Sequence, residues 1–142
     1  MIEDLLLDIT GKVNLQFYRR IFSVVKEREG SLTAMEVFSL EVIHAMNEPT
    51  ISEFAEFIGI SRPGASYKVA SLMQKGYVTK EVSAEDKREF RLRLTDKYRD
   101  YFGLYENGLK ESVRDKLDTL SDREKKHLEQ FLTQRSRDLD EE

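Results

Sequence analysis

The sequence predicts a mainly helical fold in which a helix-turn-helix is followed by a small two-stranded ribbon. Apolar residues recur at helical spacing through most of the 142 residues. After Gly76 the apolar spacing changes to two, because Phe90, Leu92 and Leu94 alternate with arginines, which is typical of a half-buried strand. The length fits one domain over residues 1–142.

A long first helix is expected from residue 2 to residue 28. Its apolar residues form two separate stripes on a helical wheel, whereas a surface helix of a monomer needs only one. We therefore expect this helix to pack on its own domain and on a second copy of the chain; burial of both stripes within one domain is the alternative. The first stripe contains Leu6, Ile9, Val13, Phe17 and Val24, and the second contains Leu7, Leu15, Tyr18, Phe22 and Val25.

Two capping boxes predict where the next two helices begin. Thr33 with Glu36 opens a helix to about residue 46, which is apolar almost all round and is expected to be the central core helix. A turn over residues 47–49 follows. Thr50 with Glu53 then opens a short helix whose inward residues are expected to be Phe54, Ala55, Phe57 and Ile58.

The helix expected over residues 61–75 has an outer face of basic and hydroxyl groups. Ser61 suits its N-cap, Pro63 is tolerated in its first turn, and Gly76 suits a left-handed stop. No Asp or Glu occurs from Phe57 to Lys80. Such a face suits a DNA major groove lined by phosphates. It contains Arg62, Ser66, Tyr67, Lys68, Ser71 and Lys75.

Charge is distributed unevenly along the chain. The net charge is -4, yet the segment from Arg62 to Arg93 contains eight Lys or Arg and four acids, so it is +4 and the remainder is -8. This asymmetry indicates a local surface for nucleic acid. An ordinary solvated face formed by Lys68, Lys75 and Lys80 is the alternative.

A ribbon and two helices complete the predicted fold. Strands are expected at residues 77–82 and 90–94, joined by the polar loop 83–89. Thr95 is expected to cap a long helix that extends past the small lobe. Ser121 with Glu124 is expected to open a last helix, which frays into a charged tail from residue 135.

Composition argues against several classes of function. The absence of cysteine excludes disulfides, thiolate metal sites and peroxide sensing through a thiol. His44 and His127 lack metal-ligand spacing, so we interpret His44 as a core or pocket-edge residue and expect no metal and no cofactor. No catalytic grouping stands out, and we expect no enzyme activity. The acidic start and the short apolar run at residues 5–7 predict no signal peptide, no membrane partner and a cytoplasmic location.

Several short motifs in the middle of the chain point to a known family. They are Leu32-Thr33, Ser52-Glu53-Phe54-Ala55, Gly59-Ile60-Ser61, Lys75-Gly76-Tyr77-Val78, and Asp86-Lys87-Arg88 followed by Leu92-Arg93-Leu94-Thr95. Together with the order of the elements, they resemble the MarR family of winged helix-turn-helix transcriptional regulators. An Asp two residues before an Arg, with a Leu-Thr closing the second strand, is the most specific of these features.

The resemblance implies a winged-helix lobe over about residues 32–95 and a homodimer joined by helices in about 1–28 and 96–138. It implies that the helix 61–75 enters the major groove of a double-stranded DNA operator, while the wing tip lies near the minor groove. The residues implied in DNA binding are Ser61, Arg62, Gly64, Ser66, Tyr67, Lys68, Ser71, Lys75, Lys87, Arg88 and Arg91.

The resemblance also implies regulation by a small anionic or phenolic effector. A pocket for it is expected near Phe17, Phe38, His44, Tyr98 and Phe102. The expected function is therefore a ligand-responsive repressor that binds a pseudo-palindromic operator. Two alternatives are a winged-helix module that binds another protein without DNA, and a ligand-binding or metal-sensing enzyme-like protein.

This chain departs from the family pattern where base contacts are expected. Tyr67-Lys68 stands where the family often has an Arg, and Pro63-Gly64 is uncommon near the start of this helix. These departures leave the predicted fold unchanged. The operator sequence is not predicted, because base contacts depend on those side chains.

Overall fold

The computed structural model describes residues 1–27 and 32–142, and within these ranges it leaves out the side chains of residues 26, 27, 101 and 103–107. The chain divides into two compact units, Met1–Arg99 and Asp100–Glu142. The end of the predicted first helix at residue 28 lies outside the described residues. Among the described residues, no helix combines the length and the apolarity needed to cross a membrane.

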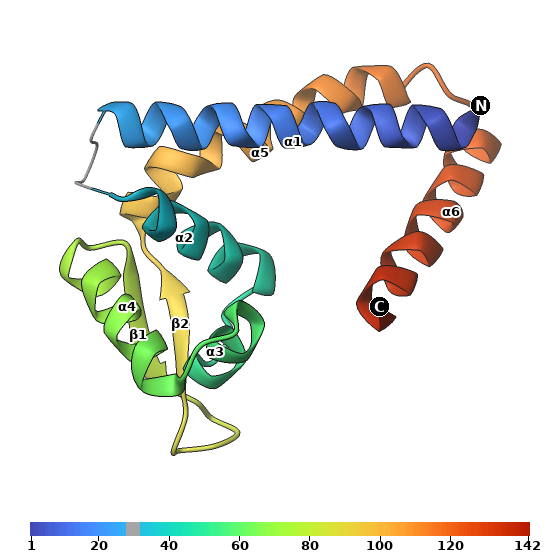
Figure 1. Ribbon diagram of the computed structural model, residues 1–142. Helices are drawn as coiled ribbons and strands as arrows, with labels where there is room; N and C mark the ends of the chain where they lie inside the picture. The colour runs from blue at the N-terminus through green and yellow to red at the C-terminus, as the bar shows by residue number, and fades with distance from the viewer. Residues whose placement is uncertain (28–31) are drawn as a thin grey trace. The chain divides into compact units, whose positions relative to one another are not determined.

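The element order agrees with the predicted mainly helical fold and its small ribbon (Figure 1). The helix α5 runs from the first unit into the second. The elements are α1 (Ile2–Glu27), α2 (Ala34–Met46), α3 (Ile51–Ile58), α4 (Arg62–Gln74), β1 (Val78–Val82), β2 (Phe90–Leu94), α5 (Asp96–Leu117) and α6 (Asp122–Glu141).

The predicted helix starts are confirmed by reciprocal capping bonds. The Thr33 hydroxyl accepts from the Glu36 backbone N–H at 3.2 Å, and the Glu36 carboxylate accepts from the Thr33 N–H at 2.9 Å. The same two bonds join Thr50 to Glu53 and Ser121 to Glu124. Each box satisfies N–H groups that have no partner inside the helix, and so fixes where the helix begins.

Glycines in the left-handed conformation end α3 and α4. Gly59 has φ of 71° and Gly76 has φ of 84°. After Gly76, the Tyr77 N–H donates to the Leu72 carbonyl at 3.0 Å, which closes the helix end. The chain can therefore turn sharply at Gly59 before α4 and at Gly76 after it.

The two strands form an antiparallel hairpin with the predicted loop. Its pairs run from Val78 opposite Leu94 to Val82 opposite Phe90. The ribbon is attached to the start of α3, because the Leu92 N–H donates to the Pro49 carbonyl at 2.9 Å. Figure 1 shows the loop between β1 and β2 extending beyond α3 and α4, as the wing of a winged helix does.

The core of the first unit is built from one apolar face of each element. The central position predicted for α2 is confirmed, but only one of its faces is buried. The fully buried side chains include Val37, Leu40 and Ile43 of α2, Phe54 of α3, Val69 and Leu72 of α4, and Tyr77, Val78 and Leu92 of the ribbon. This packing leaves the opposite face of α4 open to solvent.

Some predicted core positions are wrong. Phe57 is 65% exposed, because Ile51, Phe54 and Ala55 already form the inward stripe of α3 and residue 57 lies off it. His44 is exposed, since one residue after buried Ile43 the helix has turned by about 100°. The interpretation of His44 as a core residue is therefore incorrect.

One prediction about the last helices needs correction, and another gains a detail. The helix α5 begins directly after Thr95, as expected, and the Thr95 hydroxyl donates to the Gly76 carbonyl at 2.6 Å. The tail expected to fray from residue 135 is helical to Glu141. The side chains on this last stretch are mostly charged, so helix propensity and local pairs such as Gln134 to Asp138 at 2.8 Å support it.

Only the end of α1 that lies near α2 is buried. Ile21 and Val24 are buried, whereas every residue from 2 to 16 is exposed. The alternative in which both apolar stripes of α1 are buried within one domain is therefore wrong. In the second unit, α6 has no buried residue, and its apolar side chains Leu128, Phe131, Leu132 and Leu139 are exposed.

Candidate nucleic-acid interface

The outer face of α4 presents polar and basic groups to solvent. Its inner face is fixed by buried Ala65, Val69 and Leu72. On the outer face Tyr67 is 81% exposed, Ser66 is exposed and Lys68 is half-buried. Within the described residues, Lys68 has no ion-pair partner, and no acid occurs on the helix.

Two predicted contact residues at the start of α4 form its cap. The Ser61 hydroxyl accepts from the Gly64 N–H at 3.2 Å. A Cβ at Gly64 would lie 3.1 Å from the Ser61 Oγ, so a side chain there would force the capping hydroxyl to shift. This cap therefore fixes where the first turn of α4 begins, and Ser61, Arg62 and Pro63 are exposed there.

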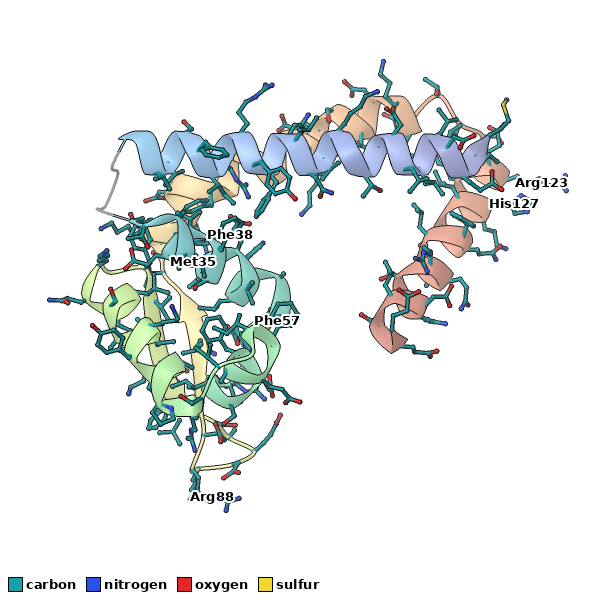
Figure 2. The ribbon with its side chains drawn as sticks, in the orientation of Figure 1. Met35, Phe38, Phe57, Arg88, Arg123 and His127 are labelled. Carbon is teal, nitrogen blue, oxygen red and sulfur yellow. The ribbon has the colours of Figure 1, made fainter. Side chains whose placement is uncertain are left out.

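The wing tip holds an arginine oriented by an aspartate. The Arg88 guanidinium donates from Nε to Asp86 Oδ1 and from Nη2 to Oδ2, both at 3.1 Å. These bonds, with a further one from the Arg88 backbone N–H, lower the pKa of Asp86, and the carboxylate raises the pKa of Arg88. The Arg88 side chain is 88% exposed, and Figure 2 shows it at the outer end of the wing.

The loop behind this arginine is ordered by a buried serine. Ser83 donates its backbone N–H to the Glu89 carbonyl at 2.9 Å. Its hydroxyl accepts from the backbone N–H groups of Glu85 and Asp86 at 3.3 and 3.4 Å. The wing is therefore a defined turn, and Lys87 is exposed on it beside Arg88.

A polar network joins α4, α3 and the wing. The Arg62 guanidinium donates to the Arg88 carbonyl oxygen at 2.9 Å and lies 3.5 Å from the Glu89 carboxylate. The Ser52 hydroxyl donates to the same carboxylate at 2.8 Å. Arg62, predicted as a DNA contact from its place on the helix, is thus also a link between the helix and the wing.

Three other predicted contacts are engaged by carboxylates. Lys75 and Ser71 both donate to Glu36 of α2. Arg91 donates to the Glu85 carboxylate at 2.9 Å and to the Glu48 carbonyl at 3.0 Å. The predicted set therefore divides into outward-facing groups, which are Ser66, Tyr67, Lys68, Lys87 and Arg88, and groups that also stabilise the lobe.

The roles of two acidic side chains and one serine in this site were not predicted from the sequence. Glu36 was assigned only to a capping box, and Glu89 and Ser52 were not assigned to the site. Ser71 and Ser52 lie 35 and 37 residues from the carboxylates they contact, so no local pattern links them. The only sign of these contacts in the sequence was an excess of basic residues together with a few acidic residues spaced along the chain.

The residues expected around an effector form two aromatic pairs in the first unit. The Phe17 and Phe38 ring centroids are 6.1 Å apart, and those of His44 and Tyr98 are 5.6 Å apart. Phe102, the fifth residue of the expected pocket, belongs to the second unit and is buried. Among the described residues, no group of three or more His, Asp or Glu is placed to hold a metal ion.

Comparison with known proteins agrees with this geometry. Residues 31–89 match the model described as MarR family. No curated protein matches the chain. A MarR protein from Peptoclostridium difficile is similar to this chain at 22% identity and a TM-score of 0.52, with 94% of this chain and 86% of that chain covered. Streptococcus pneumoniae FabT in complex with DNA is similar at 20% identity and a TM-score of 0.58, with 99% of each chain covered. A mutant of S. aureus MepR bound to oligodeoxyribonucleotide is similar at 16% identity and a TM-score of 0.53, with 94% of this chain and 97% of that chain covered.

The fold and this surface define a winged helix-turn-helix protein. Residues 31–89 belong to the MarR family, and the resemblance predicted from the sequence is confirmed. The match to this family supports a role as a DNA-binding transcriptional regulator.

Proposed function

We propose that this chain acts as a homodimeric repressor that binds a pseudo-palindromic operator in double-stranded DNA. The observation that carries the proposal is the pairing of an acid-free outer face on α4 with an exposed, oriented arginine on the wing. An α-helix fits the major groove, and an arginine fits the narrow, negative minor groove. The FabT structure and the MepR mutant structure, which contain DNA, have the same fold as this chain and support the proposal.

A homodimer is part of the proposal because both ends of the chain leave apolar side chains exposed. In α1 these include Leu6, Ile9 and Val13, and in α6 they include Phe131 and Leu132. Exposed apolar stripes of this extent favour a second protein surface. A second copy brings two α4 helices to one duplex, and half-sites about 10 bp apart are then expected.

Sedimentation at micromolar concentration tests this assembly. A mass of two chains supports the proposal. A folded monomer at this concentration would contradict both the assembly and the palindromic operator.

We also infer that a small effector binds between α1 and α2 and regulates DNA binding. Phe17 and Phe38 place two aromatic rings between α1 and α2, next to the Arg20–Glu41 ion pair at 2.9 Å. A ligand there weakens DNA binding only if it prefers the DNA-free form of the dimer. Screening small anionic and phenolic compounds against wild type and Phe38→Trp tests this. Identical responses of operator binding in the two proteins would remove the basis for a site here.

The decisive experiment for DNA binding is selection of bound fragments from a random DNA pool. Titration of the winning fragments over a range of salt concentrations should then show affinity falling steeply as salt rises, because binding releases counterions. The rival function is a winged-helix module that binds a protein. No enrichment of any DNA, together with salt-insensitive capture of a protein, would favour the rival.

A further inference from the structure

One carboxylate of α2 fixes the C-terminal half of α4. Glu36 accepts from the Lys75 ammonium at 2.7 and 2.9 Å through its two oxygens, and from the Ser71 hydroxyl at 2.9 Å. The Glu36 and Lys75 side chains are only 17% and 25% exposed. The same carboxylate also caps α2 through the Thr33 N–H. We call Glu36, Ser71 and Lys75 the Glu36 clamp.

The same end of α4 is also held by the start of α5. The Lys97 ammonium donates to the Lys75 carbonyl at 2.8 Å and lies 4.6 Å from the centre of the Tyr77 ring. A cation at the C-terminal carbonyls of a helix is favourable, because the helix dipole is negative there. The end of α4 is therefore fixed by two neighbouring helices of the first unit.

We propose that Glu36 is a positioning residue that sets the pose of α4 against DNA, and that Ser71 and Lys75 act in the Glu36 clamp and not as phosphate contacts. The inference rests on the DNA-binding function proposed above. Turning Lys75 towards a phosphate would remove both of its bonds to Glu36. A half-buried carboxylate without its cation is costly, and it would leave an unbalanced negative charge beside the DNA.

The substitution Glu36→Gln gives opposite results under the two interpretations. Glutamine keeps the capping box with Thr33, but a neutral amide holds an ammonium less strongly than a carboxylate does. If Lys75 contacts a phosphate and Glu36 competes for it, the substitution tightens binding. The salt dependence, which is the slope of log affinity against log salt concentration, then becomes steeper by about one. If Glu36 positions α4, binding weakens about tenfold and the salt dependence does not steepen.

Lys75→Met provides the complementary measurement. We expect it to weaken operator binding by a similar factor while leaving the salt dependence unchanged, because the ammonium is neutralised by Glu36 and not by DNA. The double variant Glu36→Gln with Lys75→Met should bind no worse than either single variant, since both remove the same contact.

Matched controls separate the clamp from general electrostatics. Glu56→Gln neutralises an exposed acid on α3, with the same change in net charge, and should leave affinity within about twofold. Lys68→Met removes an outward-facing cation of α4, and should lower the salt dependence by about one if it contacts a phosphate. Melting temperatures of all full-length variants show that each is folded at the assay temperature.

Each result of these titrations on the selected operator has a defined meaning. Tighter binding by Glu36→Gln, or a salt dependence that falls by about one in Lys75→Met, overturns the clamp. If Glu36→Gln is unfolded at the assay temperature, the salt dependence of Lys75→Met decides alone. Failure of the wild type to bind any DNA overturns the proposed function itself, and the positioning role with it.

Discussion

The guanidinium of Arg62 donates to the main-chain carbonyl oxygen of Arg88 at 2.9 Å, so a side chain at the start of α4 holds the wing tip. Arg62 also lies 3.5 Å from Glu89, which Ser52 of α3 contacts at 2.8 Å. The helix that is expected to enter the major groove and the arginine that is expected to enter the minor groove are therefore joined by direct contacts.

The first prediction concerns this link. Arg62→Gln should reduce the preference for A·T-rich flanks, because the wing is no longer held at a fixed distance from α4. The measurement is a set of titrations on operators with A·T and G·C flanks. Arg99→Gln is the matched control, since its guanidinium contacts Asp96 within α5 at 2.7 Å. Equal losses on both operators, with a salt dependence lower by about one, would instead make Arg62 a phosphate contact.

The second prediction concerns the wing arginine. Arg88→Ala should weaken operator binding about tenfold, and most of all where the flanks are A·T-rich, because the narrow minor groove attracts this side chain. Asp86→Ala should cause part of the same loss, although it removes a negative charge, because Arg88 then loses its orientation. If Asp86→Ala tightens binding and Arg88→Ala shows no flank dependence, the wing has no minor-groove role.

The third prediction concerns the exposed face of α4. Tyr67→Ala should change which sequences are selected from a random DNA pool, because this side chain is 81% exposed on the helix that is expected to contact bases. Lys68→Ala should act in one of two ways. A phosphate contact weakens all sequences alike and lowers the salt dependence by about one, whereas a base contact costs ~1–3 kcal/mol at one operator position. An unchanged selection profile for Tyr67→Ala would exclude a base-contacting role for it.

The fourth prediction concerns pH and the Glu36 clamp. Burial raises the pKa of Glu36, but the hydrogen bonds from Lys75, Thr33 and Ser71 outweigh it, so the pKa lies below its ordinary value of 4.5. A carboxylate with a lowered pKa in the folded state contributes stability that is fully present above its ordinary pKa. This stability is lost as the pH falls through the lowered value.

The measurement compares the free energy of unfolding of wild type and Glu36→Gln over a pH series from about 7 down to about 3. The wild type should be the more stable protein at neutral pH, and the difference should narrow below pH 4.5. A difference that stays constant across the series would show that ionised Glu36 does not stabilise the fold.

The capping boxes and the change of apolar period determined the element order before any tertiary contact was known. Thr33 with Glu36 and Thr50 with Glu53 lie three residues apart, so the bonds that begin each helix are local. The alternation of Phe90, Leu92 and Leu94 with arginines is equally local. Such signals are present in the sequence itself, because the groups that interact are close along the chain.

Only the tertiary structure decided how the basic residues divide their roles. Arg62 meets the wing backbone 26 residues away, and Lys75 meets Glu36 39 residues away. On a helical wheel Lys75 lies within about 20° of Lys68, so the sequence did not show that only one of the two meets a carboxylate. The sequence thus determined that a basic helix and a wing exist, whereas long-range packing determined which cations face outward, because ion-pair partners are chosen by distance in space and not by spacing along the chain.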